Sequence, residues 1–331
     1  MPDKSQLRLK LLALFGTDRF RYDRRTVSNF ARSTLPQSTT PFGVVTPKSR
    51  DEVIALMQLL QRHPIRWHAI SRGKNWGYGD ACASTDGQLI IDLRLMNRIV
   101  EVNDELAYAV IEPGVTQGEL AHQLLTSGSS LMLDVTGAGP DASIVGNTLQ
   151  RGFGHTPYGD HFASSCNYEV VLPDGKLIRT GFGDVTQSNV GHVYPYGNGP
   201  CLQGTFPQSH AGIVTRMTVW LMPRYETIAG FSFKTNDPSV FAQIVDRIGQ
   251  LRRNGTIDSV VHMANDLRVL STHPAMKERR GTREPLTAAE RAEMAKKAGI
   301  CQWNGLGGLY GSHRIVSAKK RDLKKAFNRI C

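Results

Sequence analysis

The chain has 331 residues, a formal net charge of +11 and 40% hydrophobic residues. This length predicts two domains, with enough chain for a large hydrophobic core. The apolar run at residues 9–15 is too short and too interrupted for a signal sequence or a membrane span, so we expect an amphipathic helix over residues 5–15 and no membrane association. The five cysteines are odd in number and show no C-x-x-C spacing. They argue against a disulfide framework and a zinc site, so we expect no metal and a cytoplasmic location.

The positive charge is concentrated near the C-terminus. Residues 1–246 carry 22 basic and 22 acidic side chains, whereas residues 247–331 carry 18 basic and 7 acidic ones. Three interpretations stay open: a solvated helical face, a surface that meets an acidic partner, and nucleic-acid binding. Nucleic acid is disfavoured because no recognised nucleic-acid motif accompanies the charge.

Helices and strands follow one another irregularly along the chain. Ser49, with Glu52 three residues later, predicts a capping box at the start of a helix over residues 49–63. The patterns predict strands at residues 67–70, 88–93 and 107–112, a helix at 116–127, and a β-hairpin at 168–181 around a Pro-Asp-Gly turn. Because these elements do not form regular βαβ units, they favour an α+β fold over a doubly wound sheet.

The glycine-rich character of the chain ends near residue 224. A strand and helices at about residues 238–253 and 288–298 are expected beyond it. We therefore expect two domains, residues 1–224 and residues 225–331.

Two glycine-rich segments carry the strongest functional signal. Residues 71–79, SRGKNWGYG, follow the expected strand at 67–70, and residues 136–148 again alternate glycines with small polar side chains. Glycines let the backbone adopt positive φ angles and bring N–H groups close to a phosphate, and Arg72 and Lys74 add positive charge. The spacing fits neither a Walker loop nor the Rossmann fingerprint. These segments predict a dinucleotide held by another fold, with a plain surface turn as the alternative for the first segment alone.

Six motifs in order resemble the p-cresol methylhydroxylase and vanillyl-alcohol oxidase family of flavoenzymes. They are SRGKNWGYG at 71–79, SIVGNT at 143–148, TPYGDH at 156–161, EVVLPDG at 169–175, PYGNGP at 195–200, and HAGIVT at 210–215 with VWLMP at 219–223. The resemblance implies a PCMH-type FAD-binding domain of two α+β subdomains over residues 1–224. It also implies that residues 225–331 are part of a substrate-covering cap.

The resemblance further implies oxidation of para-substituted phenols, either 4-alkylphenols or 4-hydroxybenzyl alcohols. A phenolate would lose a benzylic hydride to flavin N5, with dioxygen or a cytochrome as the final electron acceptor. The family tends to form homodimers. Its members continue past residue 331 with a segment that carries the His or Tyr linked to the flavin in some relatives, and residues 71–79 contain no His. We therefore expect a truncated chain that binds FAD noncovalently.

The matched motifs imply roles for individual residues. Tyr78 corresponds to the tyrosine that contacts the phenolate, and Asp160 to the carboxylate that faces the flavin as a base or as a stabiliser of positive charge. Relatives often have Tyr or Thr where this chain has His155, whose catalytic role competes with a structural one. Residues expected to contact FAD are Ser71, Arg72, Gly73, Lys74, Asn75, Trp76, Gly77, Ser143, Gly146, Asn147, Thr148, Gly154, Ile213 and Val214.

Each catalytic candidate also has a structural interpretation. Tyr78 could be a core aromatic beside a tight turn, and Asp160 could cap a helix. His161 and His210 are expected to be structural. Two other functional classes stay open for the whole chain: a flavin-binding pseudoenzyme without turnover, and a basic nucleic-acid-binding protein.

Overall fold

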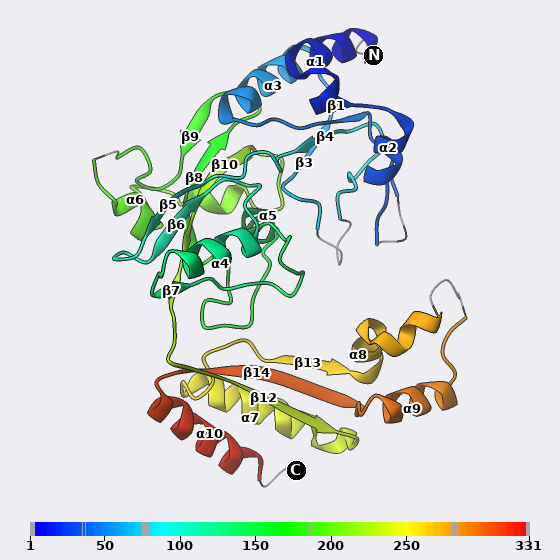
Figure 1. Cartoon of the computed structure of the whole chain (residues 1–331), viewed down its shortest axis with the longest axis vertical. Helices are drawn as coiled ribbons and strands as arrows, with labels where there is room; N and C mark the ends of the chain where they lie inside the picture. The colour runs from blue at the N-terminus through cyan, green and yellow to red at the C-terminus, as the bar shows by residue number, and fades with distance from the viewer. Residues whose placement is uncertain are drawn as a thin grey trace. The chain divides into compact units, whose positions relative to one another are not determined.

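The computed structural model describes residues 4–34, 36, 38–74, 80–185, 187–279 and 284–328. The chain divides into two compact units (Figure 1). The first comprises Met1–Gly154 and Asp160–Arg224, and the second comprises His155–Gly159 and Tyr225–Cys331. Each unit combines helices with mostly antiparallel sheet, which confirms the α+β prediction. Among the described residues, no helix is both long enough and apolar enough to cross a membrane.

The first unit begins with a four-stranded sheet in the order β1-β2-β4-β3. Its strands are β1 (Phe20–Arg21), β2 (Gly43–Val45), β3 (Trp67–Ile70) and β4 (Leu89–Asp92). β4 runs parallel to both β2 and β3, while β1 is antiparallel to β2. The parallel arrangement brings the carboxyl ends of β3 and β4 to the same edge, where Ile70 pairs with Asp92. Residue 71, the start of the first glycine-rich segment, follows directly at that edge.

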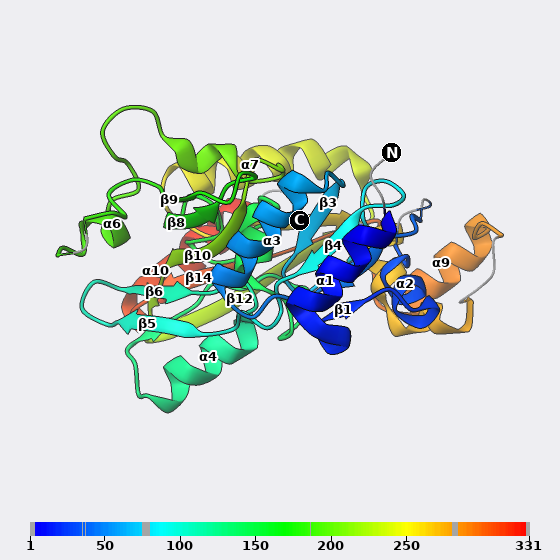
Figure 2. The same cartoon turned by 90° about the horizontal axis from the view of Figure 1, so that it is seen from above.

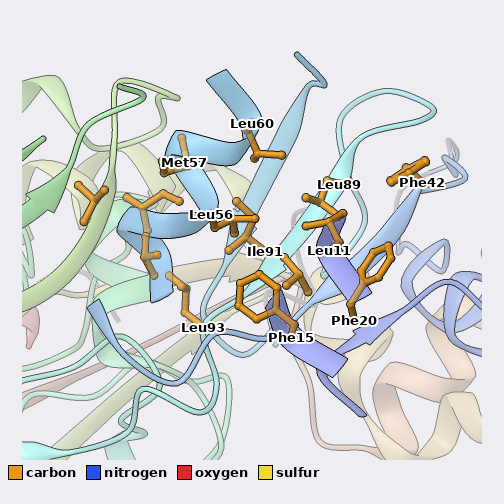
Figure 3. Packing of buried hydrophobic residues seen from close by; sticks show 14 of the residues in the cluster. Leu11, Phe15, Phe20, Phe42, Leu56, Met57, Leu60, Leu89, Ile91 and Leu93 are labelled. Atoms are coloured by element: carbon orange, nitrogen blue, oxygen red, sulfur yellow. The ribbon is translucent and has the colours of Figure 1, made fainter. Parts of the chain in front are cut away.

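Three helices accompany this sheet: α1 (Lys4–Arg19), α2 (Arg24–Phe30) and α3 (Arg50–Arg62). α1 and α3 lie along this sheet (Figure 2), and their buried apolar side chains pack against it, as predicted from the amphipathic pattern of residues 5–15 for α1. Figure 3 shows this core, in which Leu11 and Phe15 of α1 and Leu56 of α3 pack with Leu89 and Ile91 of β4. The same cluster includes Val171 and Ile213 from the second sheet, so α3 packs against both sheets of the unit.

The second sheet of this unit is five-stranded and antiparallel, in the order β5-β6-β10-β8-β9. Its strands are β5 (Ile99–Asn103), β6 (Tyr108–Ile111), β8 (Ser165–Val171), β9 (Leu177–Arg179) and β10 (Ile213–Trp220). β8 and β9 form the predicted hairpin, and Gly175 in its turn has a φ of 84°. A buried cluster joins this sheet to α4 (Gln117–Thr126) and α5 (Ile144–Leu149). Shorter elements are β7 (Leu131–Met132), which pairs with β11 (Met222–Pro223), α6 (Val190–Val193) and the 3₁₀ turn η1 (Leu202–Thr205).

The predicted capping box at Ser49 forms only in part. The Ser49 hydroxyl accepts from the Glu52 N–H at 3.3 Å, but the Glu52 carboxylate accepts from the N–H of Lys48 instead of Ser49. The Glu52 carboxylate also pairs with Arg19, and this contact holds it away from the Ser49 N–H. A full capping box stands at α4, between Thr116 and Glu119.

The second unit is built on the three-stranded antiparallel sheet β12-β14-β13. Its strands are β12 (Thr227–Thr235), β13 (His262–Asn265) and β14 (Trp303–Gly311). Its helices are α7 (Phe241–Arg253), α8 (Asp266–Thr272), α9 (Ala288–Lys297) and α10 (His313–Phe327), with 3₁₀ turns η2 (Pro238–Val240) and η3 (Pro274–Arg279). Leu251 of α7 and Val316 of α10 pack with Leu309 of β14 in one cluster. The basic Lys320, Arg321, Lys324 and Lys325 of α10 are exposed, whereas Lys319 pairs with Asp258 at 2.9 Å.

Strand β14 is rich in glycine, a residue that weakens strands. The rings of Phe231 and Phe233 on β12 occupy the space above Gly307 and Gly305, which are their register partners, and a Cβ at either glycine would overlap the facing ring. The aromatic rings thus supply the packing that the glycines lack.

Candidate functional site

The two glycine-rich segments meet inside the first unit. Ser71, which is buried at the carboxyl end of β3, lies against Gly146 of α5. A Cβ at position 146 would lie 3.2 Å from both the Cβ and the Oγ of Ser71. The fold therefore joins two stretches that are 75 residues apart in the sequence, as a shared cradle requires.

The described part of the first segment, residues 71–74, has the conformation expected of a tight loop. Gly73 has a φ of 62°, and a Cβ on it would lie 2.7 Å from the Cβ of Ala81. Both conditions restrict this position to glycine. The Arg72 guanidinium lies 3.7 Å from the Glu119 carboxylate, and Lys74 is exposed. The expected site residues Asn75, Trp76, Gly77 and Tyr78 lie outside the described residues.

The second segment is held in place by the hydroxyl of Ser143. This hydroxyl donates to the carbonyl of Pro113 at 2.7 Å and accepts from the Gly146 N–H at 2.9 Å, so it caps α5. The Thr148 side chain on the same helix is buried, and its hydroxyl has no hydrogen-bond partner within the described part of the chain. A buried hydroxyl without a partner is uncommon and marks a position where a ligand group fits.

An acidic side chain lies beside this cradle, at the end of β4. Asp92 is 1% exposed, and its carboxylate pairs with Arg94 at 2.6 Å. Burial raises the pKa of Asp92, while Arg94 and then Arg72 oppose that shift. Arg72 therefore lies between carboxylates on two sides, and its charge is partly compensated by the protein.

A second group of polar residues links the site residue Asn147 to two side chains. The Asn147 Oδ1 lies 2.5 Å from the Nδ1 of His161, and the His161 Nε2 lies 2.7 Å from the Oδ2 of Asp134. His161 and Asp134 are largely buried, with side-chain exposures of 11% and 5%. The three residues form a connected network from α5 to the segment after β7, which we call the Asn147 relay.

Two glycines of the RGFG stretch lie against this relay. A Cβ at Gly152 would overlap the side-chain amide of Asn147, and a Cβ at Gly154 would overlap the carboxylate of Asp134. The expected cofactor contact Gly154 thus has a steric role at the far end of the relay. Any other residue at these positions would displace Asn147 or Asp134.

Asp160 lies in the first unit and is exposed. Its Oδ1 accepts from the Ala163 N–H at 3.0 Å, so it caps the turn that follows. This contact corresponds to the capping role that was the structural alternative for Asp160. It uses one of the two carboxylate oxygens.

His155 belongs to the second unit, together with its neighbours up to Gly159. Its carbonyl accepts from the Tyr310 hydroxyl at 3.3 Å, and its ring centroid lies 5.7 Å from that of His262. Burial, followed by His155 and Arg268, lowers the pKa of His262.

Ile213 and Val214, the expected adenine contacts, begin the central strand β10. They pair with Val171 and Val170 of β8, whereas the ladder between β10 and β6 runs from Met217 to Trp220. Their buried side chains point into different cores, Ile213 into the one with α3 and Val214 into the one with α4.

Sequence reasoning missed Asp134 and treated His161 as structural. Asp134 follows the apolar run Leu131-Met132-Leu133, and only the pairing with a residue 27 positions later reveals its place beside the site. The glycines at 152 and 154 are the one local signal that points to close packing here.

Comparison with known proteins connects this geometry to a cofactor. Residues 41–181 match the protein family described as FAD binding domain. The chain is 33% identical over 327 residues to the 4-cresol dehydrogenase [hydroxylating] flavoprotein subunit of Pseudomonas putida, covering 97% of this chain and 62% of that protein. A crystal structure of p-cresol methylhydroxylase with substrate bound superposes with a TM-score of 0.92 at 32% identity, covering 98% of this chain and 64% of the other. The chain has the FAD-binding fold of p-cresol methylhydroxylase.

Two further relatives share this FAD-binding domain and the region that follows it. The 4-ethylphenol oxidase of Gulosibacter chungangensis, solved as an isoeugenol complex, has a TM-score of 0.92 and 29% identity over 100% of this chain and 65% of its own. The 1'-carboxy-chondrochloren decarboxylase of Chondromyces crocatus is 38% identical over 287 residues, 86% of this chain and 53% of that protein. The chain thus spans between about half and two thirds of the length of these relatives.

FAD fits the residues of the site. Ser71 and Gly146 meet without an intervening side chain, and Thr148 holds a buried hydroxyl without a partner among the described residues. Arg72 and Lys74 supply positive charge near this point for a pyrophosphate. The residues that would hold FAD are those of the two glycine-rich segments.

Proposed function

We propose that this chain forms the flavin site of an oxidoreductase that acts on para-substituted phenols of the 4-alkylphenol or 4-hydroxybenzyl alcohol type. The observation that supports the proposal most directly is the likeness to 4-cresol dehydrogenase, which extends over 97% of this chain. Two similar structures, at TM-scores of 0.92, hold a substrate and isoeugenol respectively.

In this proposal the residues of the chain bind and align the reactants. Ser71, Ser143 and Gly146 hold the cradle, and Asn147 contacts the cofactor. Tyr78 donates a hydrogen bond to the substrate oxygen and stabilises the phenolate, whose electron density eases loss of the benzylic hydride. FAD, when bound, supplies the hydride acceptor. The product is a quinone methide, to which water adds at the benzylic carbon.

Asp160 has the exposed carboxylate that this chemistry needs for a proton acceptor or for compensating positive charge. Its hydrogen bond to the Ala163 N–H fixes the orientation of the carboxylate. Reoxidation would use dioxygen or a cytochrome, and the name "flavoprotein subunit" of the Pseudomonas relative favours a partner protein as the acceptor.

A second candidate reaction is decarboxylation of a substrate that carries a carboxyl group. The observation that favours it is the 38% identity to the chondrochloren decarboxylase, above the 33% to the cresol dehydrogenase. The same flavin site serves both proposals, so the substrate decides between them.

Anaerobic mixing of the FAD-loaded chain with 4-ethylphenol tests the proposal. We expect the flavin absorbance to bleach with 4-ethylphenol but not with its O-methyl ether, which cannot form a phenolate. Tyr78→Phe should slow bleaching by about 10- to 1000-fold, as loss of one anion-stabilising donor does in other enzymes. A bound flavin that no phenol reduces would contradict phenol oxidation and favour the flavin-binding protein without turnover.

A further inference from the structure

We infer that His161, held by Asp134, is a positioning residue that fixes the side-chain amide of Asn147 for a hydrogen bond to FAD. This inference rests on the proposed flavin site. It assigns a role to two residues, His161 and Asp134, that lie behind the cofactor-binding segment.

The first step is the arrangement of atoms around the His161 ring. Both ring nitrogens face oxygen atoms, Nδ1 that of the Asn147 amide at 2.5 Å and Nε2 that of the Asp134 carboxylate at 2.7 Å. Each ring nitrogen donates when it is protonated and accepts when it is not, and the Asn147 amide carries both a donor and an acceptor, so the ring can bridge the two side chains in either protonation state. The arrangement therefore holds the Asn147 side chain through the ring, and the ring through Asp134.

Burial makes the contact between His161 and Asp134 important for both side chains. The side chains of Asp134 and His161 are 5% and 11% exposed. The second oxygen of Asp134, Oδ1, is buried without a hydrogen-bond partner among the residues that the structure describes. A buried polar group needs a hydrogen-bond partner, and His161 supplies one to the Oδ2 of Asp134.

The glycines at 152 and 154 hold both ends of the relay. A side chain at either position would overlap Asn147 or Asp134, so neither group has room to move toward that side. The geometry is thus set by packing as well as by hydrogen bonds.

The consequence concerns the direction of the Asn147 amide. One end of the Asn147 amide contacts His161, and no described residue forms a hydrogen bond with the other end. The pyrophosphate and the ring carbonyls of FAD are acceptors, and the amide NH₂ group of Asn147 is a donor that suits them. A fixed Asn147 side chain therefore favours FAD binding.

Nuclear magnetic resonance of the full chain labelled with ¹⁵N at asparagine tests the contact of Asn147 with the cofactor. We expect the Asn147 side-chain amide protons to move downfield when FAD is added, and this shift to be lost in the His161→Gln variant. The Asn147→Asp variant identifies that amide signal by its loss. An Asn147 amide that FAD leaves unmoved, or one that moves equally in His161→Gln, would overturn the inference.

Variants provide the second readout, the dissociation constant of FAD measured by flavin fluorescence. Asp134→Asn retains size but replaces the carboxyl group that holds the His161 ring, and His161→Gln removes the ring. We expect each to weaken FAD binding at least tenfold, while His122→Gln on the exposed part of α4 leaves it unchanged. Unchanged FAD affinity in a folded Asp134→Asn variant would contradict the positioning role.

The failure of the inference can be separated from failure of the proposed function. If the wild-type chain binds FAD and is reduced by a phenol, but folded His161→Gln and Asp134→Asn variants bind FAD with wild-type affinity, only the positioning role is wrong. If the wild-type chain binds no FAD, the flavin site itself is wrong, and the role of the relay toward FAD is overturned with it.

Discussion

Gly146 lies against Ser71, with room for no side chain between α5 and the end of β3. A Cβ at position 146 would come within 3.2 Å of the Ser71 Cβ and Oγ and within 3.3 Å of the Ser143 Oγ. These hydroxyls belong to the two segments that resemble FAD-binding loops. The contact is the point at which the fold converts two distant stretches into one site.

Enlarging Gly146 should therefore damage the cofactor site. We expect Gly146→Val to push Ser71 and Ser143 apart and to weaken FAD binding by at least tenfold, measured by flavin fluorescence. Gly204→Ala is the matched control, because nothing lies within 4 Å of a Cβ at that position in the same unit. Wild-type FAD affinity in Gly146→Val would show that the two segments do not form the site.

Gly73 should be sensitive for two separable reasons. Its φ of 62° is unfavourable for other residues, and a Cβ would meet that of Ala81 at 2.7 Å. We expect Gly73→Ala to lower the free energy of unfolding by about 2 kcal/mol, of which the backbone conformation accounts for about 1 kcal/mol. Gly128→Ala has a similar φ of 70° but open space around the Cβ, so it isolates the backbone cost. Urea unfolding measures both variants, and an equal loss of unfolding free energy in the two would contradict a cost from crowding against Ala81.

Asp160 can be tested so that capping and catalysis separate. Asn at this position keeps an oxygen that accepts from the Ala163 N–H but carries no charge. The free energy of unfolding of Asp160→Asn should therefore lie within about 0.5 kcal/mol of that of the wild type. If the carboxylate takes part in the reaction, flavin reduction by 4-ethylphenol should slow at least tenfold. Reduction at the wild-type rate would assign Asp160 to capping alone.

The Asp266–Arg291 pair predicts a pH dependence for the second unit. Arg291 contacts the carboxylate through two nitrogens, at 2.5 and 2.6 Å, and its hydrogen bonds lower the pKa of Asp266. The folded state then binds fewer protons than the unfolded state in the acid range. The stabilisation is fully present above the ordinary pKa of an aspartate, about 3.9. It is lost as the pH falls through the lowered pKa.

We accordingly expect Arg291→Gln to destabilise the protein at pH 7, and by less as the pH approaches the lowered pKa of Asp266. Lys297→Gln is the control, since its pair with Glu293 in α9 is 73% and 64% exposed. Urea unfolding at several pH values measures both. If the difference in unfolding free energy between Arg291→Gln and the wild type does not shrink in acid, the stabilisation does not come from the charge of Asp266.

Local patterns in the sequence predicted many elements well. The strand at residues 67–70 matches β3, and the Pro-Asp-Gly turn gives the hairpin of β8 and β9, because alternating apolar residues and turn residues act over short distances. The helix expected at 5–15 matches the first part of α1, in which Gly16 interrupts the helical backbone with a φ of 71° before the element ends at Arg19. Short β1 and β2 were not predicted, and neither was β14, whose glycines are paired with aromatic rings from another strand.

The sequence predicted residues of the candidate site only where they belong to a recognisable motif. Ser71, Ser143 and Gly146 lie in glycine-rich stretches that can be recognised in sequence, and the structure brings these three together. The relay from Asn147 through His161 to Asp134 depends on contacts between residues 14 and 27 positions apart, which no local pattern records. Tertiary packing alone places Asp134 beside a cofactor segment.

The most direct test of the account is the amount of FAD bound per chain, measured from the visible absorbance of the purified wild-type chain after equilibration with FAD and removal of the excess. The account predicts close to one FAD per chain, and a clear loss in Gly146→Val but not in Gly204→Ala. A folded wild-type chain without flavin absorbance, or equal flavin in both variants, would contradict the assignment of the site to the meeting point of Ser71 and Gly146.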